Sequence, residues 1–539
     1  MLTVERRIVA GRVARKGGSA SYRALAGAEG EKHIVRTDLS GSPGRDVDRH
    51  VRPLLTLAHL SDLHVTDVES PARFEYLNRY AGDLRFRELL TMQRPQEALN
   101  AHAIEALVRA VNSVEAAPVG GRPVQLTVMT GDAIDNTQSN ELANFVALFD
   151  GLTVHPKSGG QTLESVQVPS WPSDLFWKPE SGSGSDRFRK RYGFPHVPGL
   201  LERASRDFAA SGLGMPWLGC YGNHEQVLQG VGIINRAVAA AMVGGQKPVA
   251  PPPHLAADTA VEAFTRTPDL FMSGPTVAVT PDRGRASARL TGFLEAMLGS
   301  ETMPNGHGFG PANRQGNANY VYDTAPVRFI CLDTVSRAGG ADGRVNQALL
   351  DWLEDRLIEV HSAYTDRRGR TVTTSNDNKL VVLMSHHPYV TLNNSREQDT
   401  VENRQLLHVL HRYGNVILWL NGHVHMNAVR PHPNREGVTV GFWEVTTGSL
   451  VDWPCQGRLV EILDAGYGRV AVACTMLDHE GPVDPGEASS LIEMAGLHRE
   501  LAANDPLAGM GSPRAGTPED RNVILALPAP FNLKQIHRQ

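Results

Sequence analysis

The sequence predicts an α/β fold in which helices cover a largely parallel β-sheet. Short, nearly continuous apolar runs recur along the chain, a pattern typical of strands buried on both faces. A polar signature follows each run, and amphipathic segments separate several of them. Further apolar segments near residues 438–478 are joined by short turns, which predicts a second sheet with antiparallel strands.

The predicted elements follow one another in a regular order. The apolar runs predict buried strands over residues 54–60, 124–130, 216–221, 327–332, 379–385 and 415–420. Apolar residues at helical spacing predict helices over 98–114, 345–360 and 402–413, the last of which ends at Gly414. The later strands are predicted at 438–447, 458–464 and 468–475, with a hairpin turn between the last two.

The segments outside this pattern suggest the domain boundaries. We expect an N-terminal extension over 1–50, including an exposed Arg-containing arm, and a main domain over 51–483. Two insertions, about 137–215 and 226–320, separate strands of that domain. We expect part of the second to be helical and to fold over the functional site. The tail over 484–539 is rich in Ala, Pro and Gly, and we expect it to be loosely attached.

Composition excludes several classes of protein. Apolar residues make up 41% of the chain and charged residues 21%, an ordinary globular balance, and the net charge of −5 does not suggest a nucleic-acid binder. No apolar run is long enough to span a membrane, and the first residues lack a secretory signal, so a cytoplasmic location is expected. The cysteines form no Cys-x-x-Cys pair, which argues against a thiolate zinc site and leaves disulfides open.

Polar signatures at the strand ends carry the chemistry. Residues two apart on a strand point the same way, so Asp62 and His64 converge just past the first strand. The full set is Asp62-x-His64, Gly131-Asp132-x-x-Asp135, Gly222-Asn223-His224-Glu225, His386-x-Pro388 and Gly422-His423-x-His425. Each signature alone is weak, but together they supply carboxylate, amide and imidazole donors suited to two divalent cations.

This ordered set resembles the calcineurin-like metallophosphoesterases. All five blocks of that superfamily are present, between residues 57 and 425, and within it the chain looks most similar to an actinobacterial group without an assigned substrate. The resemblance implies a four-layer α/β/β/α sandwich of two mixed sheets with large insertions. It also implies two transition-metal ions, with Mn, Fe, Zn and Ni all compatible with the donors, and a small-molecule phosphoester substrate.

The resemblance assigns a role to each residue. Asp62, His64 and His425 would hold one metal, Asn223, His386 and His423 the other, and Asp132 would bridge both. His224 would face the substrate and protonate the leaving oxygen, with Asp135 pairing to it. Arg73, Asn394 and Arg396 are weaker candidates for phosphate contacts, and His387, beside His386, is not assigned as a ligand.

Neighbouring residues disfavour two subgroups of the superfamily. Purple acid phosphatases carry Tyr at the position of Asp135, and Ser/Thr protein phosphatases follow the Asp with Arg, where this chain has Asn136. We therefore expect a dinuclear phosphoesterase acting through a metal-bridging hydroxide, with monoesters or diesters as substrates. The alternatives are a dedicated cyclic-nucleotide or other phosphodiesterase, and a non-catalytic metal-binding scaffold that recognises a phosphorylated ligand. The oligomeric state is open.

Overall fold

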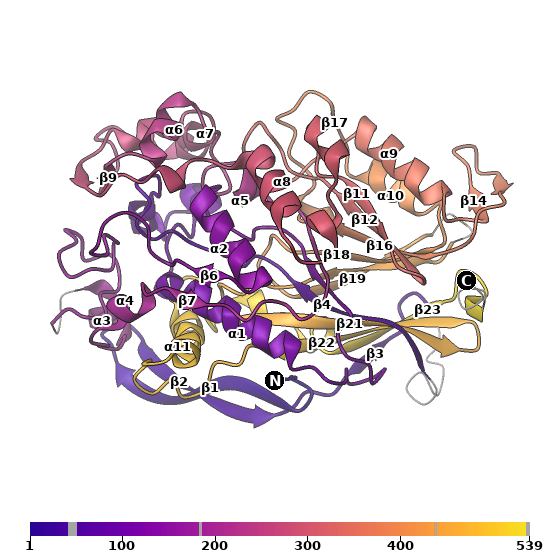
Figure 1. The fold of residues 1–539 in the computed structure, drawn as a ribbon, viewed down its shortest axis with the longest axis horizontal. Coiled ribbons are helices and arrows are strands. Elements are labelled where there is room, and N and C mark those ends of the chain that lie inside the picture. Colours follow the sequence, from indigo (N-terminus) through magenta and orange to yellow (C-terminus); the bar gives the residue numbers. More distant parts are fainter. Residues whose placement is uncertain (41–50, 183–185, 436, 438, 535–539) are drawn as a thin grey trace.

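Two stacked β-sheets form the centre of the molecule, and helices cover their outer faces (Figure 1). The computed structural model describes residues 1–40, 51–182, 186–435, 437 and 439–534. The predicted segments 1–50, 137–215, 438–447 and 484–539 each include residues outside these ranges. The predicted fold class, a four-layer α/β/β/α sandwich of two mixed sheets, is confirmed.

The first sheet has seven strands in the order β3-β23-β22-β21-β4-β5-β8. Strands β4, β5 and β8 are mutually parallel neighbours, whereas β21 and β22 run antiparallel as the predicted hairpin. The strand bounds are β3 Ile34–Arg36, β4 Arg52–Leu60, β5 Leu126–Met129, β8 Trp217–Gly219, β21 Gln456–Gly466, β22 Arg469–Asp478 and β23 Val523–Pro528.

The second sheet has six strands in the order β11-β12-β16-β18-β20-β19. Its four central strands are parallel, and β11 and β19 close the edges antiparallel to their neighbours. The strand bounds are β11 Tyr320–Asp323, β12 Val327–Leu332, β16 Leu380–Ser385, β18 Val416–Asn421, β19 Ala428–Pro433 and β20 Gly441–Thr446.

The apolar runs of the second sheet are buried on both faces because they separate two cores. In β16, Val382 and Met384 face the core between the sheets, and Val381 and Leu383 face the helices outside. This alternation follows from the two-residue period of a strand. An uninterrupted apolar run is therefore what the position of β16 in the sandwich requires.

Helices form the two outer layers. The three predicted helices are confirmed as α1 (Asn100–Asn112), α9 (Gln347–Ile358) and α10 (Arg404–Leu410), although α10 ends before Gly414. Apolar residues of α9 and α10 pack on the outer face of the six-stranded sheet, and those of α1 pack on the seven-stranded sheet. The other helices are α2 Ser139–Asp150, α3 Arg187–Tyr192, α4 Leu200–Ala204, α5 Asn223–Gln226, α6 Arg236–Met242, α7 Ala260–Arg266, α8 Arg289–Gly299 and α11 Leu491–Asn504.

Small two-stranded sheets lie in the insertions and connections. Each pairs two short antiparallel strands. They are β6 Thr153–Val154 with β7 Phe208–Ala209, β9 Gln246–Pro248 with β10 Thr276–Ala278, β13 Val345–Asn346 with β17 Thr400–Val401, and β14 Ala363–Thr365 with β15 Thr371–Thr373. The insertion 226–320 also carries α6, α7 and α8, so its predicted helical content is confirmed.

The prediction of a loosely attached C-terminal tail is wrong. Helix α11 packs beside α1, and β23 pairs with β22 inside the seven-stranded sheet (Figure 1). The N-terminal arm is also structured, since β1 (Arg6–Lys16) and β2 (Ser21–Glu29) form a hairpin. Strand β3 then pairs in parallel with β23. Both ends of the chain therefore complete one edge of the first sheet.

The cysteines and the helices bear on two expectations from the composition, those about disulfides and membrane spans. Cys220, Cys331, Cys455 and Cys474 are buried and free, so no disulfide joins them. Within the described ranges, no helix has both the length and the apolar character needed to cross a lipid bilayer.

Candidate metal centre

The predicted site residues meet where the two sheets end at the same edge of the sandwich. Asp62, Asp132 and Asn223 directly follow the neighbouring parallel strands β4, β5 and β8. His386 and His423 follow the neighbouring parallel strands β16 and β18 of the other sheet. Because carboxyl ends of parallel strands lie side by side, sequence-distant signatures converge on one place.

The backbone at this edge is held in a conformation that side-chain-bearing residues rarely adopt. Asp62, His64, Asp132, His423 and His425 have φ between 47° and 69°, in the left-handed region. Each such residue costs of order 1–3 kcal/mol, and the conformation persists only where the surrounding structure enforces it. The surrounding structure therefore holds these five residues in a strained backbone conformation at the point where their side chains meet.

Asp62, His64 and His425 form one cluster of possible metal ligands. The two imidazole Nε2 atoms lie 3.1 Å apart, and Nε2 of His425 lies 3.4 Å from Asp62 Oδ1. All three residues are buried or nearly so. Burial raises the pKa of Asp62, but the neighbouring His425 outweighs that effect and the pKa falls to about 2, so the carboxyl group is ionised.

Asp132 lies between this cluster and a second one. Its carboxylate shares a potential ligand group with His64 and His224, and another with Asp62 and His386. Nε2 of His386 lies 3.0 Å from Asp132 Oδ2, and His423 lies in a group with His386. Burial lowers the pKa of His386, but the Asp132 carboxylate outweighs it and raises that pKa to about 10.

Three of the imidazoles, those of His64, His386 and His425, are oriented by a partner on the side away from the cluster. The Nδ1 atoms of His425 and His386 lie 2.6 Å from Asp452 Oδ2 and 2.8 Å from the Thr130 carbonyl oxygen. Nδ1 of His64 lies 3.2 Å from Asp135 Oδ1. These contacts leave Nε2 of each ring directed at the cluster, as in metal sites whose ligand histidines donate their other N–H to an acceptor.

Gly222 and Glu225 shape the turn that carries Asn223. A Cβ on Gly222 would overlap Asp132 Oδ1, so only glycine fits there. Glu225 accepts hydrogen bonds from the backbone N–H groups of Gly222 and Asp132, at 2.7 and 3.0 Å. The side-chain amide of Asn223 donates to the Gly230 carbonyl at 2.9 Å, which turns its oxygen toward the cluster.

The donor atoms fit a pair of divalent cations. Among the proposed ligands, Asn223 Oδ1 is buried without a hydrogen bond to any described residue, and His386 Nε2 forms an ion pair with Asp132. Buried polar atoms normally have partners, so Asn223 Oδ1 is an atom that a metal would satisfy. The donors are carboxylate, amide and imidazole groups without thiolate, which suits Mn, Fe, Zn or Ni.

The predicted pairing of His224 with Asp135 takes a different form. Nδ1 of His224 donates to the main-chain carbonyl of Asp135 at 2.5 Å, whereas the carboxylate oxygen is 4.0 Å away. The carboxylate instead contacts His64 and, at 3.3 Å, Arg73. Burial raises the pKa of Asp135, but Arg73, His64 and His224 together outweigh it and hold the pKa below its usual range. Asp135 thus orients a proposed metal ligand as well as His224.

Several weaker candidates have structural partners instead of a place in the site. Both ring nitrogens of His387 are engaged, with Thr334 Oγ1 at 2.8 Å and the Ala341 carbonyl at 2.9 Å. Arg73 is fully buried against Glu97 and Asp135. Asn394 donates to backbone carbonyls, and Arg396 pairs with Glu262. The predicted phosphate contacts by Arg73, Asn394 and Arg396 therefore have no support here.

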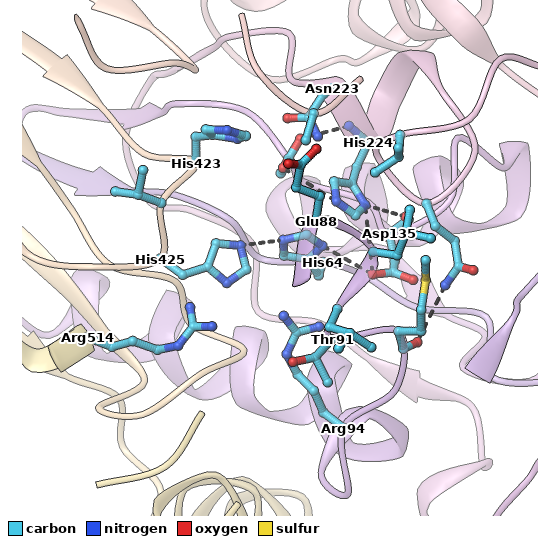
Figure 2. Close-up of a pocket in the computed structure, with 18 residues that line it drawn as sticks. His64, Glu88, Thr91, Arg94, Asp135, Asn223, His224, His423, His425 and Arg514 are labelled. Carbon is cyan, nitrogen blue, oxygen red and sulfur yellow. Dashed lines mark hydrogen bonds and ion pairs between the residues drawn. The ribbon is translucent and has the colours of Figure 1, made fainter. Parts of the chain in front are cut away.

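A cavity of about 200 Å³ opens above the cluster (Figure 2). Its floor includes His64, Asp132, Asn223, His224, His423 and His425. Its opposite wall, which we call the covering wall, consists of residues 88–92, Arg94 and Arg514. The insertion 226–320 contributes only Gln229 and Val231 to the lining, so the expectation that it walls the site holds for its first residues alone.

Sequence reasoning missed Arg94, Arg514 and Asp452. Nε of Arg94 lies 2.7 Å from Asp452 Oδ1, and Nη1 of Arg514 lies 3.0 Å from Asp452 Oδ2. Burial raises the pKa of Asp452, but both guanidinium groups outweigh it and hold that pKa well below its usual range. Asp452 follows β20 in "GSLVDWP", and its place after a strand is the signal that would have nominated it.

Comparisons with known proteins add little to this geometry. No family model and no curated protein matches the chain. Among solved structures, a dimetal phosphatase from Danio rerio is 12% identical with a TM-score of 0.36, covering 79% of this chain and 99% of that one. Purple acid phosphatase PPD1 from yellow lupin (Lupinus luteus) seeds is 10% identical with a TM-score of 0.29, covering 84% of this chain and 54% of that one.

A third solved structure, GAP50, the anchor in the inner membrane complex of Plasmodium, is 10% identical with a TM-score of 0.21. That alignment covers 77% of this chain and 85% of the other. Similarities this weak carry no argument about function. The functional proposal rests on the residues of the site.

Proposed function

We propose that the protein is a dinuclear metal-dependent phosphoesterase. One observation carries the proposal: side chains from five strand ends converge in one buried cluster, in which Asn223 Oδ1 makes no hydrogen bond to the described residues. The left-handed backbone at five of these residues supports it, because such strain is maintained at functional sites. The substrate class that we propose is a small phosphoester.

The proposed ligands divide into two sets around one shared carboxylate. Asp62, His64 and His425 would hold one ion, and Asn223, His386 and His423 would hold the other. Asp132 would be shared by the two ions, since its carboxylate clusters with His64 of one set and with His386 of the other. Two bound divalent ions supply Lewis acidity toward the phosphoryl oxygens and an acidified water.

His224 is positioned to serve the leaving group. A carbonyl oxygen can only accept a hydrogen bond, so the contact with Asp135 places a proton on Nδ1 of His224. In the protonated ring, Nε2 then carries the proton available to a departing oxygen. The ring lines the cavity and is 19% exposed, more than the other imidazoles of the cluster. This exposure suits contact with substrate better than metal coordination.

Metal-dependent turnover of nitrophenyl phosphate and bis(nitrophenyl) phosphate tests the proposal. Protein stripped with a chelator should be inactive and should regain activity when Mn, Fe, Zn or Ni is supplied. The control is Asp355→Asn, an exposed carboxylate on α9, which should behave as the wild type.

Two outcomes would change the assignment. Binding of two metals without turnover of either ester would favour the non-catalytic scaffold. Turnover that persists in the presence of chelator would show that catalysis does not require a bound metal.

A further inference from the structure

Arg514 lines the cavity, although in the sequence it is distant from all the motifs that supply the proposed metal ligands. It lies between α11 and β23, and it lines the cavity together with the proposed ligands His64 and His425. Its main-chain carbonyl accepts a hydrogen bond from the N–H of Asn427 at 2.9 Å, which ties this segment to the loop after His425. The position of Arg514 is therefore fixed relative to the proposed metal centre.

The two guanidinium groups at Asp452 differ in how much of their hydrogen-bonding capacity is used. Arg94 contacts both carboxylate oxygens, at 2.7 and 3.4 Å, and its side chain is 8% exposed. Arg514 contacts one oxygen through Nη1, and its side chain is 23% exposed. Within the described part of the chain, this is its only ion pair. A guanidinium has five N–H donors, so Arg514 keeps donors for another anion.

Asp452 is shared between the two guanidinium groups, and the buried Asp505 also interacts electrostatically with both. One carboxylate serves two guanidinium groups and also holds His425 Nδ1 at 2.6 Å. Arg94 also interacts with Asp135 and Glu97, whereas the ion-pair partner of Arg514 is the shared Asp452. An anionic group in the cavity would find an incompletely compensated cation at Arg514.

Arg514 and His224 lie on opposite sides of the imidazoles of His64 and His425 (Figure 2). A phosphoryl group whose leaving oxygen faces His224 has other oxygens directed away from that ring. In a monoester these oxygens carry two negative charges at neutral pH and above, whereas a diester carries one. The charge on the phosphoryl oxygens that face Arg514 therefore distinguishes phosphomonoesters from phosphodiesters.

We propose that Arg514 binds a charged phosphoryl oxygen of the substrate and makes the enzyme selective for phosphomonoesters over phosphodiesters. This inference rests on the proposed phosphoesterase function. Arg94 keeps a different role, since it is nearly buried and positions Asp452. Because hydrogen bonds to charged groups are stronger than neutral ones, removing Arg514 should weaken binding of a dianion about tenfold or more.

Binding of two non-substrate analogues tests this directly. Phenylphosphonate is a dianion at pH 8.5, and its monomethyl ester is a monoanion of similar shape. Calorimetry on the metal-loaded protein should show tighter binding of the dianion. In Arg514→Gln the dianion should lose about tenfold in affinity and the monoanion less than about threefold, while metal content stays at two per chain. Arg514→Lys should recover part of the loss.

The control is Arg87→Gln, which removes the same charge from an exposed position of the nearby 3₁₀ helix Leu84–Leu89 that does not line the cavity. It should leave both affinities unchanged. Equal losses for the two analogues in Arg514→Gln would overturn the proposal, and so would a parallel loss of metal. A wild-type protein that binds two metals but turns over no phosphoester would instead refute the proposed function.

Discussion

The floor of the cavity and its covering wall are built in different ways. The floor comes from residues that directly follow neighbouring parallel strands, and their spacing is local: Asp62 with His64, and His423 with His425. The covering wall comes from residues 88–92, Arg94 and Arg514, and no regular sequence pattern connects these residues. The floor is therefore positioned by the sheets, whereas the wall depends on tertiary packing.

The support behind the two regions differs in the same way. Behind the floor, oxygen atoms of Thr130, Asp452 and Glu225 accept hydrogen bonds from residues of the proposed metal centre. Behind the wall lies an apolar cluster in which Leu89 and Met92 pack with residues of the insertion 226–320, including Phe264. We infer that the floor determines the chemistry and that the wall determines which substrates reach it, and the following predictions test that division.

The largest effect is expected at the bridging carboxylate. Asp132→Asn removes a charge between the two ligand sets, so metal binding at both sites should weaken. A loss of about 4 kcal/mol of transition-state stabilisation corresponds to about a 10³-fold fall in kcat/KM on nitrophenyl phosphate. Elemental analysis and initial rates measure both quantities. Two metals per chain at wild-type affinity would show that Asp132 is not a bridge.

The second effect separates acid catalysis from metal binding. His224→Ala should keep its metals and lose about 10²- to 10⁴-fold in kcat on alkyl phosphates. The loss should be smaller on nitrophenyl phosphate, whose leaving group hardly needs a proton. The measurement is the ratio of the two losses, and equal losses would leave charge stabilisation as the role of His224.

How far the sequence leads can be judged from these same residues. The convergence of the proposed ligands was predictable, because short spacings at strand ends are kept when the sheet forms. These residues are Asp62, His64, Asp132, Asn223, His386, His423 and His425. The place of Arg514 was not predictable, because it depends on β23 pairing with β22 and on the packing of α11 against α1. Such long-range contacts leave no local periodicity.

The tail nevertheless contained readable signals. Ser490 and Glu493 form a capping box ahead of the apolar residues of α11, and "NVILALP" is an apolar run that ends at a proline. The Ala, Pro and Gly content between them outweighed these signals and produced the wrong expectation. Asp135 shows a second limit, since spacing placed it near His224 but could not show that its carbonyl, not its carboxylate, makes the contact.

A smaller effect is expected behind the floor, at a residue that touches no metal. Asp452→Asn removes the charged partner of His425 Nδ1 and of two arginines. Loss of a partner of this kind lowers metal affinity by about 10- to 100-fold. Metal titration with Asp355→Asn as the control measures the change. Unchanged affinity would mean that His425 is positioned without Asp452.

The smallest effect on chemistry is expected in the covering wall. Leu89 is 2% exposed, so Leu89→Ala should lower the free energy of unfolding by about 2–5 kcal/mol through the cavity it leaves. Metal content and turnover of nitrophenyl phosphate should change less than about threefold. Urea unfolding and initial rates measure these quantities. A loss of metal in this variant would show that floor and wall are not independent.

The most direct test of the central claim is a crystal structure of the metal-loaded protein with anomalous diffraction recorded at the absorption edge of the bound metal. We predict two anomalous peaks with Asp132 between them. Asp62, His64 and His425 should surround one peak, and Asn223, His386 and His423 the other. A single peak, or coordination by His224 or His387 in place of these residues, would contradict the account.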